Sequence, residues 1–373
     1  MKTKNWLAGW LCIVTVLLGV IGAVVYYMDP YMHYHAPCTD RFYYKLENQR
    51  YQNDGIIRNF DYDAVITGTS MTEQFRTSET DALFGTESVK VPYSGASYKE
   101  VNDSLERAFR RQPGLRLVIR GLDMNRFFDS CEAMEYERAE YPVYLYNENP
   151  FDDVKYLFNR DVAVMVYQMF ARAIQGVSPG LTSFDEYCMW QEGYVFGINS
   201  LYPDGLHYQG AGKVHAHLTS EEKLRIEENI RMNVTSLAER YPEVTFCYFF
   251  PPYSAVWWMG LAEAGEVYHQ VEAEQYVIEL LLEYDNIRLF SFNNRIDITT
   301  DLNHYKDPAH YASWINSLIL RLMYEGECLL TKENYLDYLD QELQFYTTFD
   351  YESLNEQEDY AHDEDAAAIL NQE

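Results

Sequence analysis

The chain is predicted to fold as a three-layer α/β/α domain around a mostly parallel five-stranded sheet, preceded by one N-terminal transmembrane helix and carrying a mostly helical insertion. Three observations predict this fold class. An apolar run lies near the N-terminus, short apolar segments alternate with amphipathic segments along most of the chain, and a Tyr-rich region interrupts the alternation. The length of 373 residues allows one large α/β domain with a substantial core.

The first element is the apolar run from Trp6 to Tyr27, in which Thr15 is the only clearly polar residue. At 1.5 Å per residue, a helix of this length crosses a hydrocarbon core of roughly 30 Å. Lys2 and Lys4 precede the run, which predicts a cytoplasmic N-terminus and places the rest of the chain outside the cytoplasm. A cleaved signal peptide is the alternative, but the run is longer than an ordinary signal-peptide core and no Ala-x-Ala site follows it. We expect an uncleaved, single-pass anchor in the cell membrane.

The alternating part of the chain predicts the strands and helices of the sheet domain. Apolar runs bounded by turn residues are typical of buried parallel strands, and the amphipathic runs between them are typical of covering helices. The expected strands are 62–67, 88–92, 115–122, 244–250 and 287–292, and the expected helices are 71–83, 98–112, 220–241, 266–284, 308–325 and 333–346.

The region 126–217 lacks the alternation and contains one helical stretch, 151–174. Insertions in α/β enzymes commonly cover the carboxyl edge of the sheet, where ligands bind, so we expect a lid that shapes the substrate site. A separate domain is the alternative. The expected order is a cytoplasmic N-terminus with the anchor (1–28), a connector (29–60), the α/β domain with its insertion (61–348), and an acidic, disordered tail (349–373).

The charge of the chain excludes one class of partner. The formal net charge is -29, and no Lys or Arg follows Lys332. Binding to nucleic acid needs a basic surface that displaces counterions, so we expect no nucleic acid partner. The acidic end of the chain is expected to be solvated.

Ser70 is the candidate nucleophile. It ends a buried-strand pattern and begins a helical one, so its side chain is expected at the carboxyl edge of the sheet, where backbone N–H groups face a bound oxyanion. Ser70 and Glu73 also fit a capping box, so a structural N-cap is the alternative. The pentapeptide from Gly68 to Thr72 lacks the second Gly of G-x-S-x-G, which argues against the nucleophile elbow of α/β-hydrolases.

Asp307 and His310 are the candidate acid and base partners. A carboxylate that accepts from one ring nitrogen leaves the other nitrogen free to take a proton from a serine hydroxyl. Both residues also have a structural explanation, because Asp307 followed by Pro308 is a strong helix start and His310 would then lie one turn inside the helix. We expect catalysis because the serine and the Asp-x-x-His lie at the first and last β-to-α transitions of the alternating pattern.

These motifs resemble the blocks of the SGNH (GDSL-type) hydrolases. The nucleophile block of that family resembles Gly68-Thr69-Ser70, although one residue separates Gly68 from Ser70, and its last block is the Asp-x-x-His of Asp307 and His310. The resemblance implies that a Gly after the second strand, here Gly95, forms the oxyanion hole together with the Ser70 amide. An ordinary turn glycine is the alternative for Gly95.

The third block departs from the family pattern. The family has Gly-x-Asn after the third strand, whereas this chain has Gly121-Leu122-Asp123. An ionised carboxylate only accepts hydrogen bonds and cannot replace the amide donor. Asn125 replaces that donor if the loop shifts by two residues. The oxyanion hole is therefore expected to consist of Ser70, Gly95 and Asn125, with Asp123 at the expected position of the Asn.

The anchor narrows the resemblance to membrane-anchored SGNH-like proteins of the DltD and AlgJ types, with AlgX a soluble relative. The resemblance implies an extracytoplasmic serine esterase or O-acyltransferase that acts on acyl groups of a cell-envelope polysaccharide or teichoic-acid-like polymer, with no cofactor. A membrane-bound O-acyltransferase is the implied protein partner. The alternative is a non-catalytic SGNH-like accessory module that binds a glycan or such an acyltransferase, and Asp123 is its best support.

Two further groups of residues are candidates for ligand binding. Tyr253 and Trp257 follow the fourth strand, where aromatic faces suit a sugar or an acyl group, although core packing explains them equally well. His215 and His217 lack nearby acidic or Cys ligands, and the six cysteines show no zinc-type spacing. We expect Tyr253 and Trp257 to contact substrate and expect no metal site.

Overall fold

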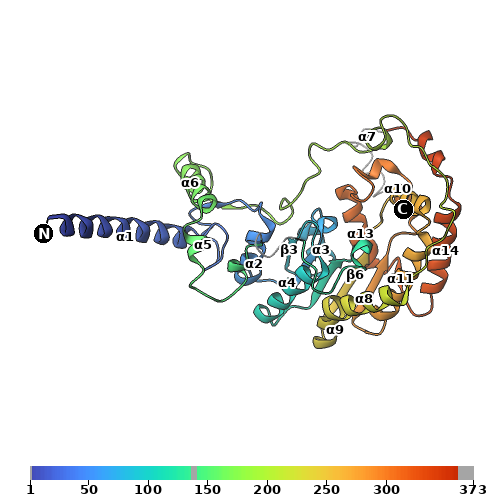
Figure 1. Cartoon of the computed structure of the whole chain (residues 1–373), viewed down its shortest axis with the longest axis horizontal. Helices are drawn as coiled ribbons and strands as arrows, with labels where there is room; N and C mark the ends of the chain where they lie inside the picture. Colours follow the sequence, from blue (N-terminus) through green and yellow to red (C-terminus); the bar gives the residue numbers. More distant parts are fainter. Residues whose placement is uncertain (1, 136–140, 360–373) are drawn as a thin grey trace. The chain divides into compact units, whose positions relative to one another are not determined.

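The structure is a computed structural model that describes residues 2–135 and 141–359, and it divides the chain into two compact units. The N-terminal unit combines residues 1–61 with 136–183, and the α/β unit combines residues 62–135 with 184–373 (Figure 1). The predicted insertion is therefore divided, because 136–183 join the N-terminal segment while 184–217 belong to the α/β unit.

The α/β unit contains a six-stranded sheet with the order β3-β2-β4-β6-β7-β8. The first five strands are parallel and β8 is antiparallel to β7. All five predicted strands are present, and β8 is a sixth that the sequence pattern did not indicate, because its two residues are too short to show a period. The strands are β2 (Ala64–Gly68), β3 (Ser88–Pro92), β4 (Leu117–Gly121), β6 (Thr245–Phe250), β7 (Ile287–Ser291) and β8 (Leu329–Leu330).

Helices cover both faces of this sheet and complete the predicted three-layer α/β/α fold. The pair α3 and α13 is in mutual contact, and α4, η4, α8 and α11 form a second continuous set of contacts. The helices are α3 (Thr77–Phe84), α4 (Tyr98–Arg111), α7 (Ile198–Leu201), α8 (Ser220–Ile230), the π-helical η4 (Arg231–Thr235), α9 (Ser236–Arg240), α10 (Ala255–Ala264), α11 (Val267–Leu281), α12 (Ile296–Thr299), α13 (Ser313–Glu325) and α14 (Tyr335–Thr348). The short 3₁₀ turns are η1 (Ser70–Thr72), η2 (Met124–Arg126), η5 (Leu302–His304) and η6 (Tyr351–Glu356).

Two predicted helices begin later than expected, and both differences concern candidate site residues. The helix predicted from 71 starts at Thr77, because Ser70 to Thr72 form a 3₁₀ turn capped by the Thr69 hydroxyl. The helix predicted from 308 starts at Ser313 with Ala312 as its N-cap, so Asp307 and Pro308 do not open it. Both positions are therefore loops that present side chains rather than regular helix starts.

The predicted acidic tail contains ordered structure at its beginning. The turn η6 buries Tyr351 and Leu354, so the ordered part extends past the expected boundary at 349. Residues 360–373, where most of the predicted disorder falls, lie outside the described residues.

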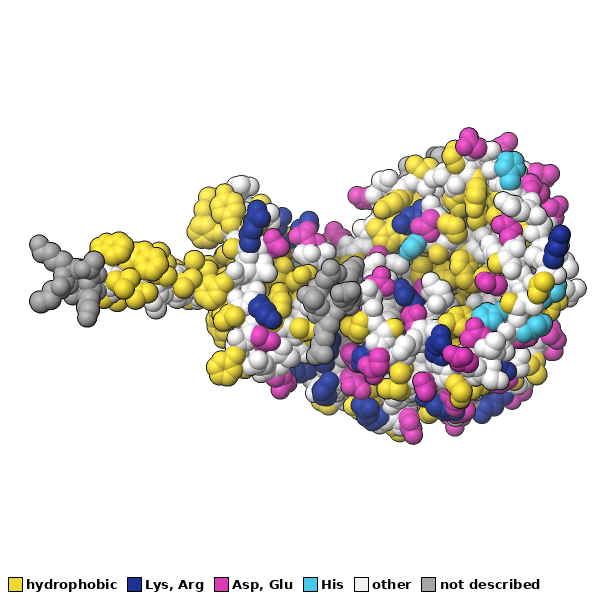
Figure 2. Space-filling view, in the orientation of Figure 1, with side chains coloured by type: hydrophobic (Ala, Val, Ile, Leu, Met, Phe, Trp, Pro, Cys, Tyr) yellow, Lys and Arg dark blue, Asp and Glu magenta, His cyan; other side chains and the backbone are white. Residues whose placement is uncertain are grey.

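The N-terminal unit is built around α1 (Lys2–Met28), and its stretch Trp6–Met28 is long and apolar enough to cross a membrane, with a mean hydropathy of 2.5. Hydrophobic side chains cover this helix (Figure 2). The segment expected as a connector contains a helix and a strand of the same unit. The other elements are β1 (Tyr43–Tyr44), α2 (Gln49–Asn59), η3 (Val143–Leu145), α5 (Val154–Leu157), α6 (Arg160–Ile174) and β5 (Gly180–Leu181), and β1 pairs in parallel with β5.

Candidate active site

The candidate residues follow strands that end at one edge of the sheet. Ser70 comes after β2, Gly95 after β3, Asp123 after β4 and Tyr253 after β6. The strand order reverses direction at β2, since β3 lies on one side of it and β4 on the other. In doubly wound sheets, ligands bind outside the carboxyl ends of the strands at such a switch point.

Ser70 is held in a tight turn directly after β2. Gly68 has φ +144°, and a side chain there would place its Cβ 2.8 Å from Thr72 Cγ2 and 3.2 Å from the Gly121 nitrogen. Only glycine fits this approach of β2 to β4. The hydroxyl of Thr69, rather than that of Ser70, accepts from the Met71 N–H, so the Ser70 hydroxyl is not consumed as a cap.

The Ser70 hydroxyl instead meets the imidazole of His310. Ser70 Oγ lies 2.8 Å from His310 Nε2, although the two residues are 240 positions apart in the chain. His310 Nδ1 lies 2.9 Å and 2.8 Å from the two carboxylate oxygens of Asp307. The predicted serine, histidine and aspartate therefore form one continuous hydrogen-bonded chain in a partly buried position.

The Asp307 carboxylate is fixed by its own loop as well as by the imidazole. Its Oδ1 accepts from the backbone N–H groups of Ala309 and His310, at 3.0 Å and 2.9 Å. Burial by itself raises the pKa of the Asp307 carboxyl, but the hydrogen bonds from His310 and from these N–H groups outweigh burial and lower the pKa to about 2. Asp307 is therefore an ionised acceptor at neutral pH, which sets the Nδ1–H tautomer of His310.

Trp190 packs against the imidazole as part of a cluster with Tyr194 and Lys306, which no motif in the sequence indicated. The Trp190 ring stands perpendicular to the His310 ring with centroids 5.9 Å apart. Lys306 Nζ lies 4.2 Å from the ring centroids of both Trp190 and Tyr194 and 3.7 Å from Asp307 Oδ2. Trp190 and Tyr194 lie more than 110 residues before Lys306 and His310 in the chain, so no local spacing could have indicated these aromatic contacts.

The two backbone donors predicted for the oxyanion hole are those of Ser70 and Gly95. The N–H groups of Ser70 and Gly95 donate to no other group among residues 2–135 and 141–359. Gly95 has φ +68°, and its carbonyl accepts from Arg126 Nη2, which fixes the turn after β3. Asn125 lies in η2, is exposed, and forms no side-chain hydrogen bond within the same described ranges.

Asp123 has a role that its place in the sequence did not indicate. Its Oδ2 accepts from the Thr69 hydroxyl at 2.6 Å, and its Oδ1 accepts from the Tyr253 hydroxyl at 2.7 Å. Burial raises the pKa of the Asp123 carboxyl, although the hydrogen bonds from Thr69 and Tyr253 oppose that rise. Both oxygens are occupied, so Asp123 holds Thr69, and through it the turn that carries Ser70.

The predicted aromatic contacts with substrate are altered by the same network. Tyr253 is only 2% exposed, because its hydroxyl is committed to Asp123 and its ring packs 4.9 Å from the ring of Trp257. Tyr253 therefore holds Asp123 in place, and its buried ring is not accessible for stacking against a substrate. Trp257 lies in the helix α10 and is half-buried.

Replacing Tyr253 with phenylalanine should lower the free energy of unfolding by about 1.5 to 3 kcal/mol, because a buried hydrogen bond to a carboxylate is lost. Chemical denaturation of the full chain measures the effect. Tyr335→Phe is the control, because the Tyr335 hydroxyl donates to Glu279 at an exposed position; equal losses in the two variants would contradict the role of the network.

His215 and His217 make other contacts, and the His215 ring lies 4.9 Å from the ring of Tyr268. His217 Nδ1 lies 2.6 Å from Glu272 Oε1 at the surface. In the described part of the chain, no group of three or more His, Cys, Asp or Glu side chains is arranged to hold a metal ion.

Comparisons with known proteins leave the family of the chain open. No family model matches the chain, and no curated protein matches it. A solved structure of a Streptococcus pneumonia protein, named in connection with platelet activating factor, is similar at 11% identity with a TM-score of 0.33, over 78% of this chain and 90% of that chain. The hydrogen-bonded Ser70, His310 and Asp307 are therefore the basis for a function.

Proposed function

We propose that this protein is a membrane-anchored serine esterase or O-acyltransferase that acts on acyl groups through an acyl-serine intermediate. The observation that carries the proposal is the continuous arrangement in which Ser70 Oγ lies 2.8 Å from His310 Nε2 and His310 Nδ1 lies 2.8 Å from Asp307. The three residues are placed as the nucleophile, base and acid of a catalytic triad, which is recognised by its geometry and not by the order of its residues along the chain.

The first half of the reaction forms the acyl-enzyme. Nε2 of His310 takes the proton of the Ser70 hydroxyl as Oγ attacks the carbonyl carbon of an ester. Asp307 accepts from Nδ1–H and stabilises the imidazolium that results, which it can do because it stays ionised at neutral pH. The imidazolium then donates its proton to the departing alkoxide, and the acyl group remains on Ser70.

The negative charge of the tetrahedral intermediate needs donors that are already in place. The free N–H groups of Ser70 and Gly95 supply two such donors in this proposal, and the exposed Asn125 is the candidate for a third. Loss of one oxyanion donor typically costs about 10² to 10³ in rate, so two backbone donors support substantial turnover even with Asp123 at the usual Asn position.

The second half of the reaction releases the acyl group to an acceptor. His310 takes a proton from water, which gives hydrolysis, or from a polymer hydroxyl, which gives transfer, as the acceptor oxygen attacks the acyl carbon. The bond between the acyl carbon and Ser70 Oγ then breaks, and the imidazolium returns its proton to Oγ. The apolar helix α1, with Lys2 and Lys4 before its span, supports an extracytoplasmic location for this chemistry. A cell-envelope polysaccharide or teichoic-acid-like polymer is the acceptor or acyl carrier that we propose, and a membrane-bound O-acyltransferase is the proposed partner.

A fluorophosphonate probe tests the nucleophile directly. The full chain in detergent should react at Ser70, because the probe phosphorylates only a serine that a neighbouring base activates. Ser70→Ala should abolish the labelling. Ser236→Ala is the matched control, since the partly exposed Ser236 hydroxyl donates to the Met232 carbonyl and contacts no histidine among the described residues.

Labelling that persists in Ser70→Ala would show that another serine reacts and would reject the assignment. If the folded wild-type chain also takes up no probe, the non-catalytic accessory module becomes the better description. If Ser70 is labelled, a second assay follows the release of acetate from an aryl acetate by the wild-type chain, with and without a sugar acceptor. Free acetate indicates hydrolysis, and an acetylated sugar indicates transfer.

A further inference from the structure

Helix α6 of the N-terminal unit carries an apolar face that no described part of its unit covers. Tyr167 is 72% exposed, Phe170 56% and Ile174 72%, and Val164 continues the same face one turn earlier. Spacings of three and four residues place these side chains along one side of the helix. Hydrophobic side chains gather at α6 and along α1 in Figure 2.

The opposite face of α6 is apolar because it packs into the core of the N-terminal unit. Val162 and Met169 are buried inside the N-terminal unit. Asp161, Gln168 and Arg172 form a narrow polar band along the helix, and the exposed Arg160 lies in the first turn, at the start of the outward face. A helix with a buried apolar face normally turns a polar face to water, whereas α6 turns a second apolar face outward. The surroundings of that face should therefore be apolar.

The position of α5 along α1 indicates what those surroundings are. Phe158, directly after α5, lies 3.7 Å from the position that a Cβ would occupy on Gly22. Gly22 precedes the end of α1 at Met28 by about 9 Å at 1.5 Å per residue. If the stretch Trp6–Met28 crosses the bilayer, Phe158 lies beside the span at the depth of the acyl chains.

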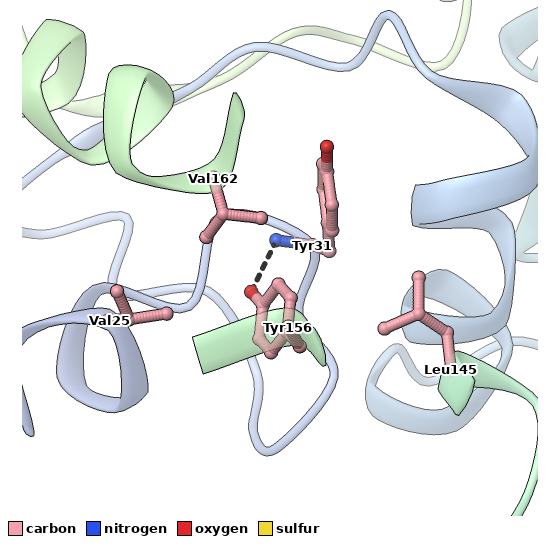
Figure 3. Close-up of a cluster of buried hydrophobic side chains, with 5 residues drawn as sticks. All are labelled: Val25, Tyr31, Leu145, Tyr156 and Val162. Atoms are coloured by element: carbon pink, nitrogen blue, oxygen red, sulfur yellow. Dashed lines mark hydrogen bonds between the residues drawn. The ribbon is translucent and has the colours of Figure 1, made fainter. Parts of the chain in front are cut away.

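The end of α1 packs into the core of the N-terminal unit, so the position of α5 along α1 is fixed. Val25 is 2% exposed and packs with Tyr31, Leu145, Tyr156 and Val162 (Figure 3). The Tyr156 hydroxyl accepts from the Tyr31 N–H at 3.1 Å and donates to Asp29 Oδ1 at 2.7 Å.

The Asp29 carboxylate also orders the turn that leaves the helix. It accepts from the backbone N–H groups of His33, Tyr34 and His35 at 2.7 to 3.1 Å, and it is fully buried. Asp29 thus joins the last turn of α1 to α5 through Tyr156 and to the following segment through its backbone.

We infer that α5 and α6 insert into the outer leaflet beside α1, with Phe158, Val164, Tyr167, Phe170 and Ile174 in contact with lipid. The bilayer is the partner, and the tyrosine and phenylalanine side chains are those that favour its interface. The inference rests on the proposed membrane anchoring by α1. With this insertion, three helices of the N-terminal unit contact the bilayer, and α1 is not the single membrane contact.

The test uses the full chain in phosphatidylcholine vesicles and compares two cysteine variants on the same helix. Phe170→Cys lies on the outward apolar face, and Gln168→Cys lies in the polar band. Modification by a membrane-impermeant maleimide is read for each peptide by mass spectrometry and normalised to the native Cys38. Phe170→Cys should react at least about tenfold more slowly than Gln168→Cys, and a phosphatidylcholine with a photoreactive acyl chain should cross-link to residues 158–174.

The native Cys12 separates failure of this inference from failure of the anchor. Cys12 is exposed in the structure and lies within the span, so the bilayer should protect it. If Cys12 is protected while Phe170→Cys reacts as fast as Gln168→Cys, the insertion of α6 is rejected and the anchor stands. If Cys12 also reacts, α1 does not span the bilayer and both proposals fail. Protection of Phe170→Cys without lipid cross-linking would assign the face to a second copy of the chain and reject the bilayer as its partner.

Discussion

Replacing Asp307 with asparagine should lower kcat for ester hydrolysis by about 10⁴ while the fold persists. The carboxylate accepts from His310 Nδ1 with both oxygens, at 2.9 Å and 2.8 Å. An asparagine in the same place presents an N–H₂ group to Nδ1 and selects the tautomer that puts the hydrogen on Nε2. That tautomer cannot accept the Ser70 proton, so the imidazole loses its function as a base.

The pH dependence of this loss is part of the prediction. The pKa of the Asp307 carboxyl is lowered to about 2, so the wild-type carboxylate is ionised from pH 5 to pH 8, and titration of this carboxyl should contribute nothing to the pH dependence of the two rates in that range. Steady-state hydrolysis of an aryl acetate measures both rates. Asp285→Asn, an exposed change in the same unit, is the control.

Combining Asp307→Asn with Ser70→Ala should add little to the loss caused by Ser70→Ala alone, because groups that act as one unit do not contribute additively. Fully additive losses would mean that the two residues act independently, which contradicts the triad.

The second large effect is expected on stability, from two carboxyl groups buried between α11 and α14. Glu274 and Glu342 are both fully buried and interact directly. Gln270 and Asn293 donate to Glu274 at 2.9 Å and 3.2 Å. Burial raises the pKa of Glu274 to about 7, and burial together with repulsion from Glu274 raises the pKa of Glu342 well above its usual value.

These raised values make the fold less stable at higher pH. The unfolded chain releases the protons near pH 4.5, whereas the folded chain keeps them up to about pH 7, so stability is full below pH 4.5 and is lost as the pH rises through 7. A change of this size corresponds to a loss on the order of 3 kcal/mol.

Glu342→Gln removes one of the two titrating groups and should make the chain more stable than wild type at pH 8 and similar to it at pH 5. Denaturant unfolding of the full chain at both pH values measures the effect. Glu279→Gln on the exposed side of α11 should leave the pH dependence unchanged. If Glu342→Gln shows the wild-type pH dependence, the buried pair does not titrate as proposed.

The sequence indicated the strands well because buried parallel strands are continuous apolar runs. The run from Thr245 to Phe250 is an example, since every residue after the first is buried. The predicted helix starts were less accurate at positions where the expected capping side chain makes a different contact. Thr69 takes the cap that Ser70 was expected to provide, and a loop replaces the helix start at Asp307.

The site was predictable in part for a related reason. Ser70, Asp307 and His310 each sit at an end of the alternating pattern, so their order along the chain was informative. The residues that support them were not, since Tyr253 reaches Asp123 across 130 positions and Trp190 reaches His310 across 120. Such contacts depend on the packing of the finished sheet, which leaves no periodic signal in the sequence.

The division of the chain between two units has a consequence for its synthesis. Residues 1–61 are made first, but their unit also needs residues 136–183, which follow β2, β3 and β4. The sheet in turn waits for β6 and β7, which are made after the N-terminal unit is complete. Neither unit can finish folding as a contiguous piece of nascent chain, so α1 leaves the ribosome before α5 and α6, which pack against it in the folded unit, have been made.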